Sequence, residues 1–169
     1  GTQYMERIGE TSRQVLKEMR LLVFELRPLA LELDGMVVAL SQRLDAVERR
    51  AGVDARLVFE EPLLLPARTE EELYRVVQEA LNNSLKHSAA TQLSISISTG
   101  NGLVSVDVED NGVGFDTVAV GQSGGMGLCN MQDRMDKLGG SFTITTSQEE
   151  GTRLDFQAPI SESQAAENS

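Results

Sequence analysis

Residues 93–114, LSISISTGNGLVSVDVEDNGVG, carry the clearest pattern in the chain. Apolar residues alternate with polar ones on both sides of Asn101-Gly102, which is the pattern of two strands that each bury one face. Asn-Gly is the strongest short signal for a tight turn between antiparallel strands. The stretch therefore predicts a β-hairpin whose second strand runs directly into Asp110-Asn-Gly-Val-Gly114.

Helical periodicity marks the segments before this hairpin. A helix is expected from residue 36 to Gly52, and residues 56–60 follow as a short strand. The apolar stripe of that helix consists of Met36, Val37, Leu40, Leu44 and Val47. The next helix is predicted to begin at Thr69, because Thr is a good N-cap and Glu72 completes a capping box. Its buried face is predicted to consist of Leu73, Val76, Val77, Ala80, Leu81 and Leu85.

The segment after the hairpin adds one helix and two strands. The helix ends at Gly139-Gly140, and the strands are expected at 141–146 and 153–158. The apolar side of the helix consists of Leu128, Met131, Met135 and Leu138. Most of the five strands are joined as hairpins and do not alternate with helices. This order predicts a two-layer α/β sandwich with one helical face rather than a doubly wound dinucleotide-binding fold.

The first 30 residues carry a heptad seam. Its positions step by three and four residues alternately, and all but Ser12 are apolar: Met5, Ile8, Ser12, Val15, Met19, Leu22, Leu26 and Leu29. Pro28 is expected to break this helix near Arg27. The helix could pack on its own domain or belong to a helical bundle shared between subunits. The sustained 3.5-residue period favours the bundle.

Composition excludes several classes of protein. The 169 residues carry a formal charge of −11, and residues 57–169 alone hold 6 basic and 17 acidic residues, which argues against a nucleic-acid binder. No apolar run reaches the ~20 residues of a membrane span, so we expect no membrane contact by this chain. One cysteine, Cys129, excludes an internal disulfide, and we expect it to be a buried small apolar residue. The chain begins with Gly, and we treat it as a fragment whose parent could carry a membrane anchor.

Three groups of residues could carry chemistry, and the first lies on the helix before the hairpin. Glu79, Asn82, Asn83 and Lys86 fall beside its apolar arc, with His87 at the edge. Glu79 and Asn83 are one turn apart, and their oxygens are the kind of ligand that Mg²⁺ prefers. Taken alone, this pair fits a solvated helix face better, because both residue types are common on surfaces.

The second and third groups are rich in glycine. In Asp110-Asn-Gly-Val-Gly114, an acid at a strand end is followed by glycines that let the backbone pass close to a flat ligand. The carboxylate could accept a hydrogen bond from an exocyclic amine, although the same residues also suit a simple turn. Gly124-Gly-Met-Gly-Leu128 precedes a helix whose N-terminus could bind an anion, although a glycine run alone is weak evidence and also fits a flexible loop.

In combination, the three groups resemble the motifs of one ATPase superfamily, which joins DNA gyrase, heat-shock chaperone, histidine kinase and mismatch-repair ATPases. Residues 79–87 resemble its N box, residues 110–114 its first glycine box and residues 125–128 its second. Gly151-Thr152 before a strand resembles its last motif. The resemblance implies the α+β Bergerat ATP-binding fold, a two-layer α/β sandwich with a mixed five-stranded sheet, preceded here by a long N-terminal helix.

The resemblance also implies how ATP and Mg²⁺ would be bound. Asn83 would coordinate Mg²⁺, and Glu79 would assist through the waters of the metal or by polarising the attack. Lys86 and His87 would contact the phosphates.

At the other end of the nucleotide, Asp110 would bind the adenine amino group, with Thr152 behind it. Close approach of the backbone to ATP would depend on Gly112, Gly114, Gly125 and Gly127, the last followed by Leu128. Residues 117–124 would form a short lid without the aromatic box of larger kinases.

A narrower resemblance comes from Leu26-Arg27-Pro28 and from the pattern that runs from Gly127-Leu128 through Asn130-Met131 and Arg134 to Gly140. Both are similar to sensor histidine kinases that pair with response regulators of the helix-turn-helix nitrate-regulator type. The resemblance implies that residues 1–30 are the second helix of the dimerisation and phosphotransfer hairpin. Residues 31–160 would be the catalytic and ATP-binding domain, and 161–169 a disordered tail.

The expected function is therefore the ATP-binding catalytic part of a cytoplasmic sensor histidine kinase. It would donate the γ-phosphoryl group to a histidine on an upstream helix, for relay to an aspartate of the response regulator. The full-length protein would form a homodimer through the helical hairpin. His87, the only histidine, would belong to the ATP pocket, so we expect no autophosphorylation of this chain alone.

Two other functions are weighed against this one. A partner-sequestering module of the same fold, similar to anti-sigma-factor serine kinases, is the alternative, but it has no need of the heptad helix. A pseudokinase is disfavoured because every motif residue for nucleotide binding is present.

Overall fold

The sheet is built around the predicted hairpin. Strands β2 (Gln92–Gly100) and β3 (Leu103–Asp110) pair antiparallel, with Ile95 opposite Val108 and Ile97 opposite Val106. The turn at Asn101-Gly102 has φ values of 55° and 74°, and two central residues with positive φ are what a type I′ turn requires. The computed structural model describes residues 29–114, 125–147 and 149–161, together with positions 3, 7–11 and 15.

Three more strands complete a mixed sheet with the order β1-β2-β3-β5-β4. Strand β1 (Asp54–Phe59) joins β2 in parallel. Strand β5 (Gly151–Pro159) pairs antiparallel with β3, and β4 (Ser141–Ser147) pairs antiparallel with β5. The α+β fold with a mixed five-stranded sheet is thus confirmed.

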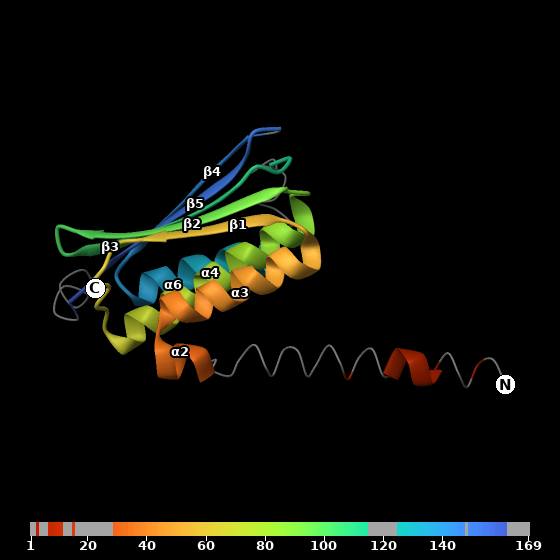
Figure 1. Ribbon diagram of the computed structural model, residues 1–169, viewed down its shortest axis with the longest axis horizontal. Coiled ribbons are helices and arrows are strands. Elements are labelled where there is room, and N and C mark those ends of the chain that lie inside the picture. The colour runs from red at the N-terminus through yellow and green to blue at the C-terminus, as the bar shows by residue number, and fades with distance from the viewer. Residues whose placement is uncertain are drawn as a thin grey trace.

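Three helices cover one face of this sheet, as Figure 1 shows. They are α3 (Met36–Ala51), α4 (Ala67–His87) and α6 (Gly125–Lys137), and α4 contacts both of the others. The short helix α2 (Leu29–Asp34) packs against α3. The sheet therefore has a helix-covered face and a face that these three helices leave open.

The core lies between the sheet and the helices. Every second residue of the strands packs there against the apolar face of the helices, which recurs every 3.6 residues. Side chains such as Ile95, Val106 and Phe156 of the sheet are fully buried with Val77 of α4 and Met131 of α6. The ring of Phe156 stacks on that of Phe142, with 4.9 Å between centroids. Helix α4, in the middle of the layer, is thereby held on the sheet by its apolar arc.

The start of α4 differs from the prediction. The helix begins at Ala67 after Pro66, and no side chain caps it through a hydrogen bond. Thr69 lies inside the first turn and is buried, while the Glu72 carboxylate pairs with Arg134 of α6 at 2.7 Å. The predicted capping box at Thr69 is therefore wrong, because a tertiary partner takes its acidic residue.

Three other expectations need correction. Helix α2 was not expected, because Pro28 was predicted to break the preceding helix near Arg27. Leu85 is exposed rather than buried, since the sheet-facing arc of α4 continues through Ser84. Cys129 is also exposed, because it lies two residues before the buried Met131 and hence about 200° away around α6.

Some expectations fall outside the described residues. Most of the heptad seam between Met5 and Leu26 does, as do the lid at 117–124 and the tail after residue 161. Of the seam, Ile8 and Val15 are described, and both side chains are exposed. Within the described part of the chain, no helix is both long and apolar enough to span a membrane.

Candidate nucleotide-binding site

The helix-covered face of the sheet turns polar at one end. Asp110 of β3 lies directly opposite Thr152 of β5, which lies opposite Thr146 of β4. Asp110 and Thr152 are buried, at 5% and 8% exposure, and the hydroxyl oxygens of Thr146 and Thr152 are 3.0 Å apart. The apolar core is therefore bordered by a row of polar side chains at the C-terminal end of β3.

The carboxylate of Asp110 is held by two donors. The Ser84 hydroxyl of α4 donates to Oδ2 at 2.7 Å, and the backbone N–H of Gly112 donates to Oδ1 at 2.9 Å. Each oxygen keeps a further lone pair, because a carboxylate can accept about four hydrogen bonds. The buried carboxylate is thus fixed in place and still able to accept a hydrogen bond from a ligand.

The last turn of α4 and the first glycine box are tightly joined. Ser88 donates its hydroxyl to the Ser84 carbonyl, and its own carbonyl accepts from the Val113 N–H at 2.8 Å. A Cβ at Gly112 would lie 2.2 Å from the Ser88 carbonyl oxygen, which no real side chain tolerates. Gly112 is therefore required because the chain passes directly against the helix end.

A second cluster lies on the side of α4 that faces α6. Glu79 and Asn83 are both half-buried there, next to Gly127 in the first turns of α6. A Cβ at Gly127 would lie 2.5 Å from Glu79 Oε1 and 3.4 Å from Asn83 Nδ2. The glycine thus brings the backbone of α6 against the carboxylate and amide that the sequence analysis singled out.

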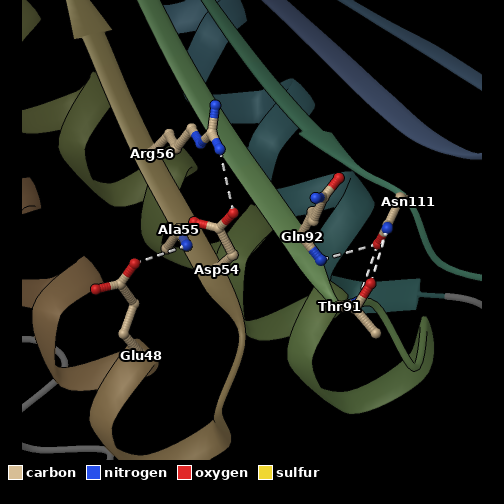
Figure 2. Close-up of polar contacts among 7 residues, drawn as sticks. All are labelled: Glu48, Asp54, Ala55, Arg56, Thr91, Gln92 and Asn111. Carbon is tan, nitrogen blue, oxygen red and sulfur yellow. Dashed lines mark hydrogen bonds and ion pairs between the residues drawn. The ribbon is translucent and has the colours of Figure 1, made fainter.

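Asn111 has a structural role next to the site. Its side-chain oxygen accepts from the N–H groups of Thr91 and Gln92, both at 2.9 Å, and its amide donates to the Thr91 hydroxyl at 2.9 Å (Figure 2). These bonds tie the end of β3 to the start of β2. Asn111 therefore fixes the end of the strand that carries Asp110.

The opposite, open face of the sheet carries a hollow of about 280 Å³ that also reaches Asp110. Its lining includes Asp54 and Arg56 of β1, which pair with each other (Figure 2), and Glu109 of β3. These side chains are exposed and belong to the solvent face. The groups with ligand chemistry, by contrast, converge on the helix-covered face.

The structure thus brings the predicted residues together in two clusters along α4. One cluster contains Asp110, Gly112 and Thr152, and the other contains Glu79, Asn83 and Gly127.

Three further predicted residues lie outside both clusters. Lys86 is exposed on the last turn of α4, Leu128 is half-buried on α6, and Gly114 follows the first cluster with φ of 67°. The side chain of His87 and the surroundings of Gly125 lie outside what the structure describes.

Three polar residues of this site were missed by the sequence analysis: Ser84, Ser88 and Thr146. Ser84 could have been found, because it occupies a position of the buried arc of α4 where the pattern predicts an apolar residue. Thr146 gives no such signal, because only the pairing of β4 with β5 places it beside Thr152.

Comparisons with known proteins agree with this geometry. The sequence profile of the histidine kinase-, DNA gyrase B-, and HSP90-like ATPase family matches residues 68–162, which include both clusters. A histidine kinase domain from the Erythrobacter litoralis EL346 blue-light activated histidine kinase has a similar fold, with a TM-score of 0.65 at 20% identity. That likeness covers 78% of this chain and 63% of the other.

Curated relatives include sensor histidine kinase MctS of Rhizobium johnstonii, 37% identical over 162 residues, and sensor histidine kinase LiaS of Bacillus subtilis, 30% identical over 151 residues. These alignments cover 93% and 89% of this chain but only 34% and 41% of the relatives. The chain thus spans well under half the length of these relatives. The family profile matches more than half of the residues of this chain, and ATP is the ligand that the family implies. The chain therefore belongs to the family of histidine kinase-, DNA gyrase B- and HSP90-like ATPases.

Proposed function

We propose that this chain is the ATP-binding catalytic part of a sensor histidine kinase. The observation that carries the proposal is the placement of the two clusters on one helix: Ser84 holds the Asp110 carboxylate, while Glu79 and Asn83 meet the backbone of α6. A nucleotide that spans these clusters would have its base at one and its phosphates at the other. The names of the relatives, which are sensor histidine kinases, support this function over a partner-sequestering module.

The adenine end would be recognised by Asp110, whose carboxylate can accept from the exocyclic amine. Thr152, opposite Asp110 in the ladder, would lie behind the base. Gly112, and Gly114 with its positive φ, would keep the chain close to the ligand without a clash. Burial makes this recognition selective, because a buried acceptor left without a donor is costly.

The phosphate end would be formed by Glu79, Asn83 and the first turns of α6. Asn83 and Glu79 fit a magnesium ion, because Mg²⁺ in nucleotide sites takes one or two protein oxygens besides phosphates and water. Among the described residues, no group of three or more His, Cys, Asp or Glu side chains is placed to hold a metal ion. When bound, Mg²⁺ would neutralise phosphate charge. Lys86 and His87 would contact phosphates, and Gly125, Gly127 and Leu128 would bring backbone N–H groups toward them.

In the full-length protein, the γ-phosphoryl group of ATP would pass to a histidine upstream of residue 1, with release of ADP, and then to a response regulator of the helix-turn-helix output type. Residues 1–30 would supply the second helix of the dimerisation hairpin, residues 31–160 the catalytic domain, and the reaction would take place in the cytoplasm. The exposed side chains of Ile8 and Val15 support a helix that needs a partner, since apolar seam positions are normally covered.

The test of the whole proposal is incubation with labelled ATP. The chain is expected to bind ATP and to show no stable label, whereas a longer protein that includes the upstream helix is expected to become labelled and dimeric. Acid-labile label on this chain that disappears in His87→Ala would contradict the assignment of the acceptor.

The metal ligand has its own test. Asn83→Ala is expected to remove most of the Mg²⁺-dependent part of ATP binding, measured by calorimetry with and without the metal. Gln42→Ala, an exposed amide on α3, is the control and should leave that dependence unchanged. An unaltered Mg²⁺ dependence in Asn83→Ala would remove Asn83 from the metal site.

A further inference from the structure

Helices α4 and α6 touch at two points that are seven residues apart on each helix. Glu72 of α4 meets Arg134 of α6, and Glu79 of α4 meets Gly127 of α6. The order reverses along the two helices, so they run antiparallel. Seven residues correspond to about 10 Å along a helix, or two turns. The contact at Gly127 and the contact at Arg134 are therefore matched in spacing.

The contact at Arg134 is an ion pair with a hydrogen bond, which requires a defined geometry. Nη1 of Arg134 lies 2.7 Å from Oε2 of Glu72, and the two side chains are 33% and 19% exposed. Arg68, one turn before Glu72, also donates to the carbonyl oxygen of Lys137 at 3.3 Å, close to the end of α6. An ion pair that is partly buried, short and hydrogen-bonded constrains geometry more than an exposed pair does.

Apolar packing between the two points constrains the register less. Between the points, Met131 of α6 is fully buried and Leu128 packs against the core, and the fully buried Met135 follows directly after Arg134. Methionine is unbranched and adaptable, and apolar burial has no preferred direction. Apolar burial holds α6 on the core without specifying a polar partner on α4, whereas the ion pair joins one named residue of each helix.

The contact at Gly127 depends on the position of α6 along α4. The α6 backbone is so close to Glu79 that a Cβ at Gly127 would lie 2.5 Å from Oε1, and the Glu79 side chain would have to move away. A displacement by one residue would move Gly127 by about 1.5 Å along the axis and 100° around it. The residues proposed to hold Mg²⁺ and phosphates would then lose their contact with α6.

We propose that Glu72 and Arg134 form a positioning pair that sets α6 against α4, so that the backbone at Gly127 stays on Glu79 and Asn83. The pair touches neither ATP nor the metal, and it acts through the register of α6. This inference rests on the proposed function of Glu79 and Asn83. The adenine cluster should be much less affected, because Ser84 and β3 hold Asp110 independently of α6.

The test is a charge exchange across the pair. Glu72→Arg and Arg134→Glu are compared with the double variant Glu72→Arg/Arg134→Glu, and the Kd for ATP is measured by calorimetry with and without Mg²⁺. Each single variant is expected to weaken Mg²⁺-ATP binding by roughly 3- to 30-fold, and the double variant to recover most of the loss. Binding without Mg²⁺ should change by less than about 2-fold, which a general loss of folding would not produce.

A matched exchange serves as the control. Asp54→Arg/Arg56→Glu reverses an exposed pair within β1 that joins no two elements, and it should leave both Kd values unchanged. If a reversal variant fails to fold, Glu72→Gln provides the same comparison without a repulsive charge. Wild-type protein that does not bind Mg²⁺-ATP would refute the proposed function itself. Wild-type binding together with no loss in the variants, equal losses with and without Mg²⁺, or no recovery in the exchange would overturn the positioning role.

Discussion

Two aspartates on one strand show how the faces of this sheet differ. Asp110 and Asp107 lie three residues apart on β3 and point to opposite faces. Asp110, on the helix-covered face, is buried and receives hydrogen bonds from Ser84 and Gly112. Asp107, on the open face, lies opposite Asp155, and Arg153 bridges the two carboxylates.

The neighbours of each carboxylate decide what it can do. Two donors hold Asp110 ready to accept from a ligand. Burial and the neighbouring Asp155 carboxyl raise the pKa of Asp107 to about 6, so near neutral pH it begins to retain a proton that it shares with Asp155. The hydrogen bond from Asp107 holds the pKa of Asp155 below its usual value. The same residue type thus forms a binding group on one face and a proton-sharing pair on the other.

Truncating the core under the helix-covered face should have the largest effect. Phe156→Ala removes a fully buried ring that stacks on Phe142, and it is expected to lower the free energy of unfolding by about 3–5 kcal/mol. Urea denaturation measures this loss. Gln157→Ala, the next residue and exposed on the open face, should change it by less than about 0.5 kcal/mol. A comparable loss in both variants would show that the two faces do not differ as described.

Substituting Gly112 should have the second-largest effect. In Gly112→Ala the new Cβ would clash with the Ser88 carbonyl oxygen, and overpacking of this kind costs about 1–3 kcal/mol. ATP affinity should fall as well, because the Gly112 N–H holds Asp110. Gly100→Ala, where no atom lies within 4 Å of the added Cβ, is the control for thermal unfolding and calorimetry. Unchanged stability and affinity in Gly112→Ala would refute the tight junction.

Replacing each aspartate in turn with alanine tests whether only the one on the helix-covered face contributes to ATP binding. Asp110→Ala should weaken ATP binding by about 1–3 kcal/mol, since a buried acceptor for the adenine amine is lost. Asp107→Ala should leave the affinity unchanged, because its side chain lies on the opposite face. Calorimetric Kd values for both variants decide the matter. Equal losses, or none in Asp110→Ala, would remove Asp110 from the proposed site.

The smallest effect is expected from Asp107→Asn, and it should depend on pH. Because the folded-state pKa of Asp107 lies above its unfolded value of 3.8, the stability it contributes is present below about pH 4 and is lost as the pH rises through about 6. Asparagine avoids this loss and can still donate to Asp155. The variant should therefore be more stable than wild type at pH 7.5, by less than about 1 kcal/mol because solvent screens the pair.

Thermal unfolding between pH 4 and 8 measures that difference. The advantage of Asp107→Asn should shrink steadily below pH 6. A constant difference across the range would show that Asp107 and Asp155 do not share a proton.

Local patterns predicted most of the helices and strands, and each error has a physical cause. The alternation around Asn101-Gly102 predicted β2 and β3, and Gly52 ends α3 in the left-handed conformation, as expected of a C-cap. The start of α4 was wrong because Glu72, which suits a capping box in sequence, pairs with Arg134 instead. The prediction for Cys129 was wrong because residue type was weighed above its position on the helix.

Periodicities and short motifs predicted the five strands, the helices α3, α4 and α6, the candidate ligand groups and the resemblance to an ATPase family, because they are properties of neighbouring residues. The strand order, the partner of Asp110 and the register of α6 against α4 depend instead on tertiary packing. Ser84 and Asp110 are 26 residues apart, and Glu72 and Arg134 are 62 apart. Contacts over such distances depend on how whole elements pack, because burial draws the elements together without specifying which polar groups meet. That pairing, rather than composition, makes one aspartate of β3 a candidate for binding ATP and leaves the other facing solvent.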